Sequence, residues 1–174
     1  MALPPLQNGA LPHGRWVCEP ADVEAAFVHG LAPERQKIWD DWVQLTDTLR
    51  SKVGRVPAAW LSGSFLTDKP VPGDLDSVYV VDVADYQAAR LDPLRQQFVT
   101  VVAMNWVKPL LNISVDSFIL EWDPTPGPMR TSSPDYYSNR GYWDDLWVRQ
   151  RDLDPRLESI PRRGYVEVIL DGYR

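Results

Sequence analysis

Apolar residues recur with helical spacing in several stretches of the chain, which predicts a layer of α-helices. The longest stretch runs from Pro33 to about Lys52, ahead of Gly54, and carries one apolar stripe formed by Ile38, Trp42, Leu45 and Leu49. A shorter helix is predicted at 20–28, and a mostly helical segment at 82–106 is interrupted near Pro93. We expect the long helix to pack against one face of a sheet.

Short apolar runs rich in β-branched and aromatic residues predict strands at 58–61, 74–81, 110–122 and 165–170. The second run has two apolar faces, which is typical of a central strand. Pro109 is expected to end the helical segment before the third run. The last run alternates weakly, so we expect it to close the edge of the sheet.

The chain is expected to form a single domain over residues 19–174, preceded by an extended arm at 1–18 that packs along its surface. The aromatic stretch after residue 133 is predicted to be helical beyond Arg140. Its rings either stack on a nucleobase or pack on the sheet, and packing is favoured because nothing in the sequence aims them at a site; they are Tyr136, Tyr137, Tyr142, Trp143 and Trp147.

The formal net charge of −6 opposes non-specific binding of nucleic acid, which depends on Lys and Arg contacts to phosphate. A local patch remains conceivable because five arginines lie close together, at 149, 151, 156, 162 and 163. They are interleaved with Asp152, Asp154 and Glu158, so a solvated segment of mixed charge is favoured over a phosphate-binding strip.

Cys18 is the one cysteine of the chain, which excludes an intrachain disulfide. No apolar window approaches the roughly 20 residues of a membrane span, and the first residues lack the pattern of a secretion signal. We therefore expect a cytoplasmic protein without a membrane partner.

Candidate chemistry is concentrated in AAWLSGSFLTDKPVPGDLDSVYVVD, residues 58–82. In a strand, residues i and i+2 point to the same side, so Asp74 and Asp76 project together while Leu75 enters the core. Paired carboxylates suit Mg²⁺, which completes its shell with water and substrate phosphates. Gly63 and Ser64 offer backbone N–H groups and a hydroxyl that can approach phosphate oxygens closely.

A third carboxylate stands in the run LLNISVDSFIL. Period-2 alternation there places Asn112, Ser114 and Asp116 on one face, and an aspartate inside such a run is poorly explained by solubility. Phosphatases and glycosyltransferases that use Asp-x-Asp carry the pair at the end of a strand. Here the strand begins at the pair, which favours nucleotide chemistry.

The order Gly63-Ser64, Asp74-x-Asp76 and Asp116 resembles the signature of the DNA polymerase β-type nucleotidyltransferase superfamily. The GSF form of the motif, the opening LPPLQNGALPHG and the late run RGYVEVIL resemble more narrowly a short nucleotidyltransferase-like family of bacteria and phages. The resemblance implies an α/β (α+β) fold with a small mixed sheet and helices packed mainly on one face.

The resemblance also implies transfer of a nucleoside monophosphate from an NTP such as ATP to a hydroxyl, with Mg²⁺ (or Mn²⁺) held by Asp74, Asp76 and Asp116. In that scheme Gly63 and Ser64 bind the phosphates, and Asp116 either completes a second metal position or acts as base. Lys69, inside the motif loop, and Arg140 are the cationic candidates near the triphosphate.

The acceptor is left open. By analogy with minimal nucleotidyltransferases of toxin–antitoxin and phage-defence systems, a macromolecular hydroxyl is favoured, either a protein side chain or a tRNA end. Two alternatives stand beside it: a non-catalytic nucleotide-binding or antitoxin-like module on the same fold, and transfer to a small molecule such as an aminoglycoside-like antibiotic.

Overall fold

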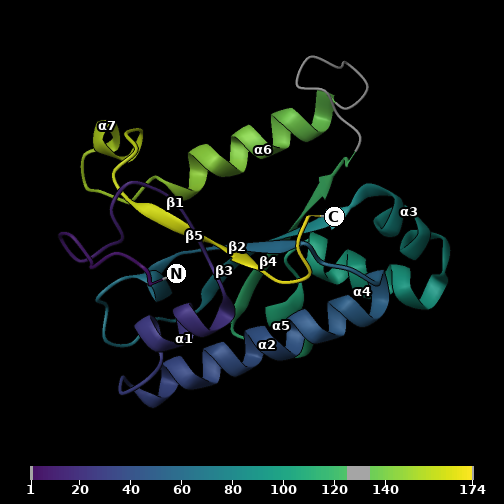
Figure 1. Cartoon of the computed structure of the whole chain (residues 1–174), viewed down its shortest axis with the longest axis horizontal. Helices are drawn as coiled ribbons and strands as arrows, with labels where there is room; N and C mark the ends of the chain where they lie inside the picture. The colour runs from purple at the N-terminus through teal and green to yellow at the C-terminus, as the bar shows by residue number, and fades with distance from the viewer. Residues whose placement is uncertain (1, 125–133, 174) are drawn as a thin grey trace.

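The computed structural model describes residues 2–124 and 134–173, which form an α+β fold around one five-stranded mixed sheet (Figure 1). The strand order is β1-β5-β2-β3-β4. The strands are β1 (Gly14–Cys18), β2 (Ala58–Ser62), β3 (Leu75–Asp82), β4 (Val115–Trp122) and β5 (Gly164–Ile169). The outer pairs β1–β5 and β3–β4 are parallel, whereas β2 runs antiparallel to both of its neighbours.

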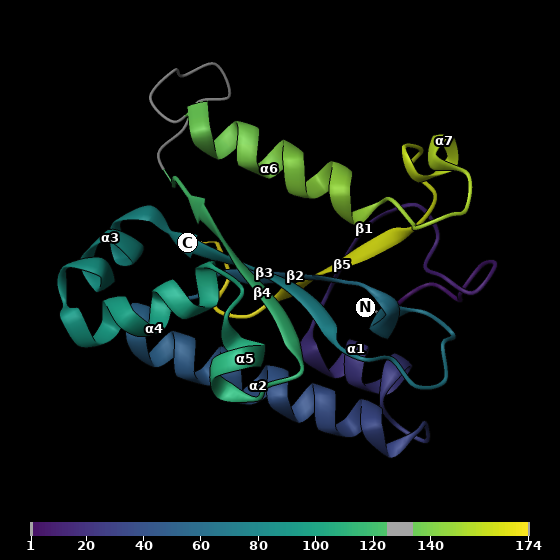
Figure 2. The ribbon, with the colours of Figure 1, turned by 180° about the vertical axis from the view of Figure 1, so that it is seen from behind.

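Most helices cover one face of this sheet, and α6 lies on the other (Figures 1 and 2). The first group comprises α1 (Pro20–Phe27), α2 (Pro33–Val53), α3 (Val83–Leu91), α4 (Pro93–Ala103) and α5 (Val107–Leu111). The remaining helices are α6 (Pro134–Trp147), the one-turn α7 (Pro155–Glu158) and a 3₁₀ turn η1 (Ser64–Leu66). The predicted mixed sheet with helices mainly on one face is confirmed.

Alternation along β3 explains how the two faces differ. Leu75, Tyr79 and Val81 enter the larger core under α2, while Val78 and Val80 join a smaller core that contains Trp147 of α6. The polar atoms buried on the α2 face are paired: Trp42 Nε1 donates to Ser77 Oγ at 3.1 Å, and Thr46 Oγ1 lies 3.0 Å from the Tyr79 hydroxyl. The predicted packing of the long helix behind the strand is confirmed.

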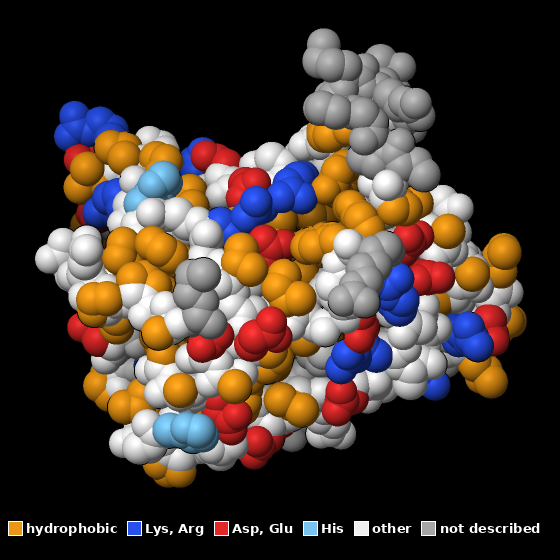
Figure 3. Space-filling model, in the orientation of Figure 1, with side chains coloured by type: hydrophobic (Ala, Val, Ile, Leu, Met, Phe, Trp, Pro, Cys, Tyr) orange, Lys and Arg blue, Asp and Glu red, His pale blue; other side chains and the backbone are white. Residues whose placement is uncertain are grey.

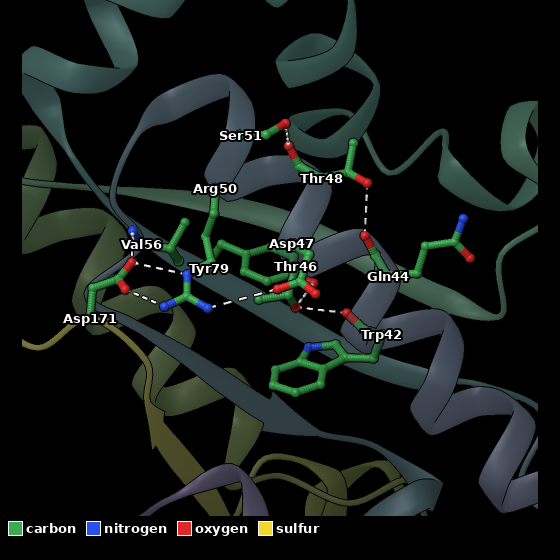
Figure 4. A network of polar contacts seen from close by, with 10 residues as sticks. All are labelled: Trp42, Gln44, Thr46, Asp47, Thr48, Arg50, Ser51, Val56, Tyr79 and Asp171. Atoms are coloured by element: carbon green, nitrogen blue, oxygen red, sulfur yellow. Dashed lines mark hydrogen bonds and ion pairs between the residues drawn. The ribbon is translucent and has the colours of Figure 1, made fainter.

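The end of α2 is fastened to the end of the chain (Figure 4). Arg50 pairs with Asp171, whose Oδ2 also accepts the backbone N–H of Val56 at 2.8 Å. Since Asp171 follows β5, this cluster joins α2, the turn before β2 and the end of β5. It therefore fixes the end of the sheet at which β2 begins and β5 ends.

The segment expected to be an irregular arm contributes an edge strand. Residues 14–18 pair with β5 in parallel, and β5 consequently lies inside the sheet, not at its edge as the weak alternation predicted. Glu167 is the charged residue of this strand, and it does not face solvent. Its side chain is buried, pairs with Arg15 at 3.3 Å and accepts a hydrogen bond from the Tyr173 hydroxyl.

The boundaries before β4 also differ from the prediction. Pro109 lies inside α5, where the first turn of a helix tolerates proline, and Asn112 ends that helix with φ of +55°. The strand therefore begins at Val115, and Asn112 and Ser114 are outside the ladder that carries Asp116. Helix α6 begins at Pro134, ahead of the predicted start after Arg140.

Candidate functional site

A single row of residues crosses three strands at one end of the sheet. Asp76 of β3 is in register with Ser62 of β2 on one side and with Asp116 of β4 on the other. Because residues in register on adjacent strands point to the same side of the pleat, Asp76 and Asp116 lie on the same face of the sheet. The chain turns at Gly63 immediately after this row, and Asp74 lies two residues before Asp76.

Six of the seven site residues expected from the sequence line one cavity of about 1020 Å³: Gly63, Ser64, Lys69, Asp74, Asp76 and Asp116. Its far wall is formed by the end of α6, by residues 149–159 and by Arg163. Arg140 is not brought to this cavity. Its guanidinium lies over the Trp60 ring, 5.2 Å from the centroid, and donates to the Tyr136 hydroxyl at 2.8 Å.

Gly63 occupies a position that a side chain would block. Its φ is +84°, which residues with a Cβ rarely adopt, and a Cβ built there would lie 1.8 Å from Asp76 Oδ2. The Asp76 carboxylate therefore occupies the space that a side chain at position 63 would need. This contact gives a physical reason for the glycine of the Gly-Ser pair.

Asp76 is the aspartate of the site whose pKa is shifted from its ordinary value. Burial raises the pKa of its carboxyl to about 6, and the negative charges of Asp74 and Asp116 add to the rise, which Arg163 and Lys108 partly offset. Within the described residues, no hydrogen bond to this carboxylate is found. A carboxylate that is buried, unpaired and crowded by like charges has a strong affinity for a proton or a cation.

Lys108 lies between the other two carboxylates. Its ammonium is 2.5 Å from Asp74 Oδ2 and 2.7 Å from Asp116 Oδ2. Burial alone would lower the pKa of Lys108, but hydrogen bonds to Asp116 and Asp74 outweigh it and the pKa is raised. The neighbouring Asn105 donates to Asp116 Oδ1 at 3.0 Å and accepts from the Ser117 N–H at 2.9 Å, which fixes the Asp116 side chain.

Arg163 faces Asp76 from the opposite side. It is 8% exposed, and its guanidinium donates to Ser62 Oγ and, at 3.3 Å, to the carbonyl of Gly63. Burial lowers the pKa of Arg163, and the charge of Asp76 acts against this. Its Nε is buried and has no hydrogen-bond partner among the described residues.

The remaining arginines of the mixed-charge segment are mostly neutralised locally. Arg149 pairs with Asp145, Arg156 with Asp154, and Arg162 with Asp152. The face shown in Figure 3 likewise has Lys and Arg side chains interspersed with Asp and Glu. The mixed-charge interpretation holds for these three pairs. Arg163 differs because it is buried beside Asp76, and Arg149 and Arg151 also line the cavity.

A family model described as "Family of unknown function (DUF6932)" matches residues 4–169. The chain belongs to this family. The matched span of DUF6932 includes every residue of the site described above, from Gly63 to Arg163. Comparisons with the curated proteins and with the solved structures gave no match.

In this DUF6932 protein, Arg35 binds the backbone of the motif loop, the segment from Ser64 to Lys69. The sequence patterns did not single out this arginine. Its buried guanidinium donates to four backbone carbonyls, those of Phe27 (3.1 Å), Phe65 (2.8 Å), Thr67 (2.9 Å) and Lys69 (2.5 Å). Three of these belong to the segment that follows Gly63. Arg35 thereby fixes the path of the chain from Ser64 to Lys69 along the cavity.

The aromatic residues of α6 pack on the sheet. Trp143 and Trp147 contact Phe118 of β4, with ring centroids 4.6 and 6.5 Å apart, while Tyr142 is exposed. Of these two tryptophans, Trp147 also lines the cavity. The packing interpretation of this aromatic stretch is confirmed for Trp143 and Trp147.

The three aspartates fit a hard cation by their chemistry. Asp74 and Asp116 already share a positive group, and Asp76 has no direct partner among the described residues. Over the same residues, no group of three His, Cys, Asp or Glu side chains forms a ready-made metal cage. No helix in the described part of the chain has the length and apolar character to cross a membrane.

Proposed function

We propose that this protein is a metal-dependent nucleotidyltransferase that moves a nucleoside monophosphate from an NTP to a hydroxyl group. One observation carries the proposal: Asp76 and Asp116 stand in register on adjacent strands, facing the same cavity as Asp74 and the Gly63–Ser64 turn. Carboxylates on one side and a phosphate-binding turn on the other are what an NTP with its cation needs.

Asp74 and Asp76 are the residues that would hold Mg²⁺. When bound, the ion neutralises charge on the phosphate oxygens and orients them for in-line displacement. Gly63 and Ser64 would receive the phosphates through backbone N–H groups and the serine hydroxyl. Arg163 supports the turn from behind through the Gly63 carbonyl and supplies a positive charge.

The reaction forms a bond between the acceptor oxygen and the α-phosphorus and breaks the bond to the β-phosphate, releasing pyrophosphate. The acceptor proton must pass to a base. Asp116 is the carboxylate left for this role, because Asp74 and Asp76 would hold the ion and Asp116 lines the same cavity. Lys108 and Asn105 hold the Asp116 side chain in place.

The cavity supports a macromolecular acceptor. Its volume of about 1020 Å³ lies at the top of the range of roughly 300–1,000 Å³ for small-molecule sites, which leaves room beside a nucleotide. Arg149, Arg156 and Arg162 are paired locally, and the formal net charge of −6 opposes contact with a nucleic-acid backbone, although Arg151 and Lys69 also line the cavity. A hydroxyl on a protein side chain is therefore the preferred acceptor, ahead of a tRNA end.

The test is transfer of label from each α-³²P-NTP, with Mg²⁺ or Mn²⁺, to the protein or RNA of a cell lysate. We expect labelled protein with the native sequence and none with Asp76→Asn. Asp82→Asn, at the other end of β3 and outside the cavity, is the matched control and should transfer normally. Nucleotide binding without transfer under either metal would contradict the proposal, and transfer confined to a purified aminoglycoside would contradict the macromolecular acceptor.

A further inference from the structure

The ammonium of Lys108 lies between two of the three carboxylates of the site. It is within hydrogen-bond distance of both Asp74 and Asp116. We propose that Lys108 is a tethered cation that replaces one divalent ion, so that the protein binds one such ion fewer than its three carboxylates would otherwise hold. The inference rests on the proposed function for the identity of the site.

The fold positions Lys108 firmly. It lies on α5, a short helix that packs against β4 through the buried Val107 and ends at Asn112. Neighbouring Asn105 holds Asp116 from its other oxygen. The positions of both carboxylates that contact the ammonium are therefore fixed by other parts of the fold. Asp116 is fixed by β4 and Asn105, and Asp74 by the turn into β3. Lys108 and Asp74 are 34 positions apart in the sequence.

Charge balance supports the assignment. Three carboxylates meet in one partly buried place, and two positive side chains, Lys108 and Arg163, face them. Arg163 is engaged with Ser62 and Gly63, so Lys108 is the cation in direct contact with the carboxylates. An ammonium carries one positive charge without any need for metal, and it offsets half of the negative charge of Asp74 and Asp116 through short charge-assisted hydrogen bonds.

The donors left for a divalent ion are the carboxylate of Asp76 and the second oxygen of Asp74. One or two carboxylates, completed by water and phosphate oxygens, are the usual protein contribution to a Mg²⁺ site. The ligands that remain therefore suffice for one ion with the nucleotide. A second ion needs Asp116, which Lys108 holds.

The experiment counts Mn²⁺ ions per chain by electron paramagnetic resonance, with α,β-methylene-ATP present so that no transfer takes place. Lys108→Met, which removes the charge and keeps most of the stem, should bind one more ion than the native protein. Lys108→Gln should do the same and serves as the second variant if the first fails to fold. Lys37→Met is the matched control, because Lys37 also lies 2.7 Å from a carboxylate, that of Asp41, but outside the cavity.

Equal ion counts in the native protein and both Lys108 variants would overturn the inference. Should neither variant fold, two ions bound by the native protein would overturn it equally. The count is independent of transfer. A protein that binds one ion and gains another in Lys108→Met but labels no acceptor would contradict the proposed function while supporting the role of Lys108.

Discussion

Gly63 and Asp76 lie so close that a β-carbon on the glycine would be 1.8 Å from Oδ2 of the aspartate. The turn after β2 and the carboxylate of β3 therefore form one unit, although 13 positions separate them in the printed sequence. Any side chain at position 63 must displace Asp76 or the turn. The backbone conformation, with φ of +84°, adds strain for every residue other than glycine.

Gly63→Ala should abolish nucleotide transfer and weaken nucleotide binding at least tenfold, because Asp76 has to leave its position in the row. Binding of α,β-methylene-ATP measured by calorimetry, together with the transfer assay, checks this. Gly54→Ala is the matched control, since Gly54 also has a positive φ, +93°, but nothing within 4 Å of a Cβ. Equal losses in both variants would show that backbone strain alone accounts for the effect.

Asp76→Asn should stabilise the protein at neutral pH. The pKa of this carboxyl rises from 3.8 in a free chain to about 6 in the folded protein. Between these two values the unfolded chain has released the proton and the folded chain has not, so stability falls as the pH rises through this window and is level above it. The full difference amounts to about 3 kcal/mol.

Urea unfolding in EDTA at pH 3.5 and pH 7.5 measures this effect. We expect Asp76→Asn to gain up to about 3 kcal/mol over the native protein at pH 7.5 and almost nothing at pH 3.5, where the aspartate is mostly protonated in both states. Asp82→Asn should show no such gain, because Asp82 caps α3 by accepting the N–H of Ala84. Parallel pH profiles for Asp76→Asn and the native protein would disprove the raised pKa.

The features predicted most accurately from the sequence are the helices and strands that depend on residues close together in the chain. The stripe of α2, the stop at Gly54, and the two strands on either side of the Gly-Ser and Asp-x-Asp pairs depend on local spacing, and the structure has them within a few residues. The placement of Asp116 beside Asp76 came from the resemblance, because no local pattern states which strands pair.

The residues that sequence reasoning missed act through distant contacts. Arg163 reaches Ser62 across 101 positions, Arg35 reaches Lys69 across 34, and Lys108 contacts both Asp74, just before β3, and Asp116 of β4. A faint signal existed for Lys108, the lone charge in the run WVKPLL. Arg140 was placed at the phosphates because it is cationic, but its helical spacing from Tyr136 directs it to the aromatic cluster over Trp60.

Arg163→Lys should weaken nucleotide binding roughly tenfold, the equivalent of one charge-assisted hydrogen bond. Lysine keeps the charge that faces Asp76 but lacks the rigid planar guanidinium, whose Nη2 donates to both Ser62 Oγ and the Gly63 carbonyl. Calorimetry with α,β-methylene-ATP and Mg²⁺ measures the change. Arg162→Lys, the exposed neighbour that pairs with Asp152, should bind as the native protein does, and an equal loss there would refute a specific role for Arg163.

Arg35→Met should destabilise the fold by roughly 3–5 kcal/mol, since four backbone carbonyls lose their donor in a buried place. Three of these carbonyls belong to residues 65–69, so amide hydrogen exchange should accelerate most in that segment. Urea unfolding and exchange measured by mass spectrometry test both points. Arg95→Met removes an exposed arginine paired with Asp92 and should cost less than about 1 kcal/mol.

The four hydrogen bonds of Arg35 also predict the stability of the conservative variant Arg35→Lys. An ammonium has three donors on a compact head and cannot reach four carbonyls arranged around a guanidinium, so stability should return only in part. If the motif loop is held by Arg35, nucleotide affinity should follow the same order as stability: native protein, Arg35→Lys, then Arg35→Met. Full affinity in Arg35→Met, with the loop exchanging as in the native protein, would mean that the segment from Ser64 to Lys69 keeps its path along the cavity without this arginine.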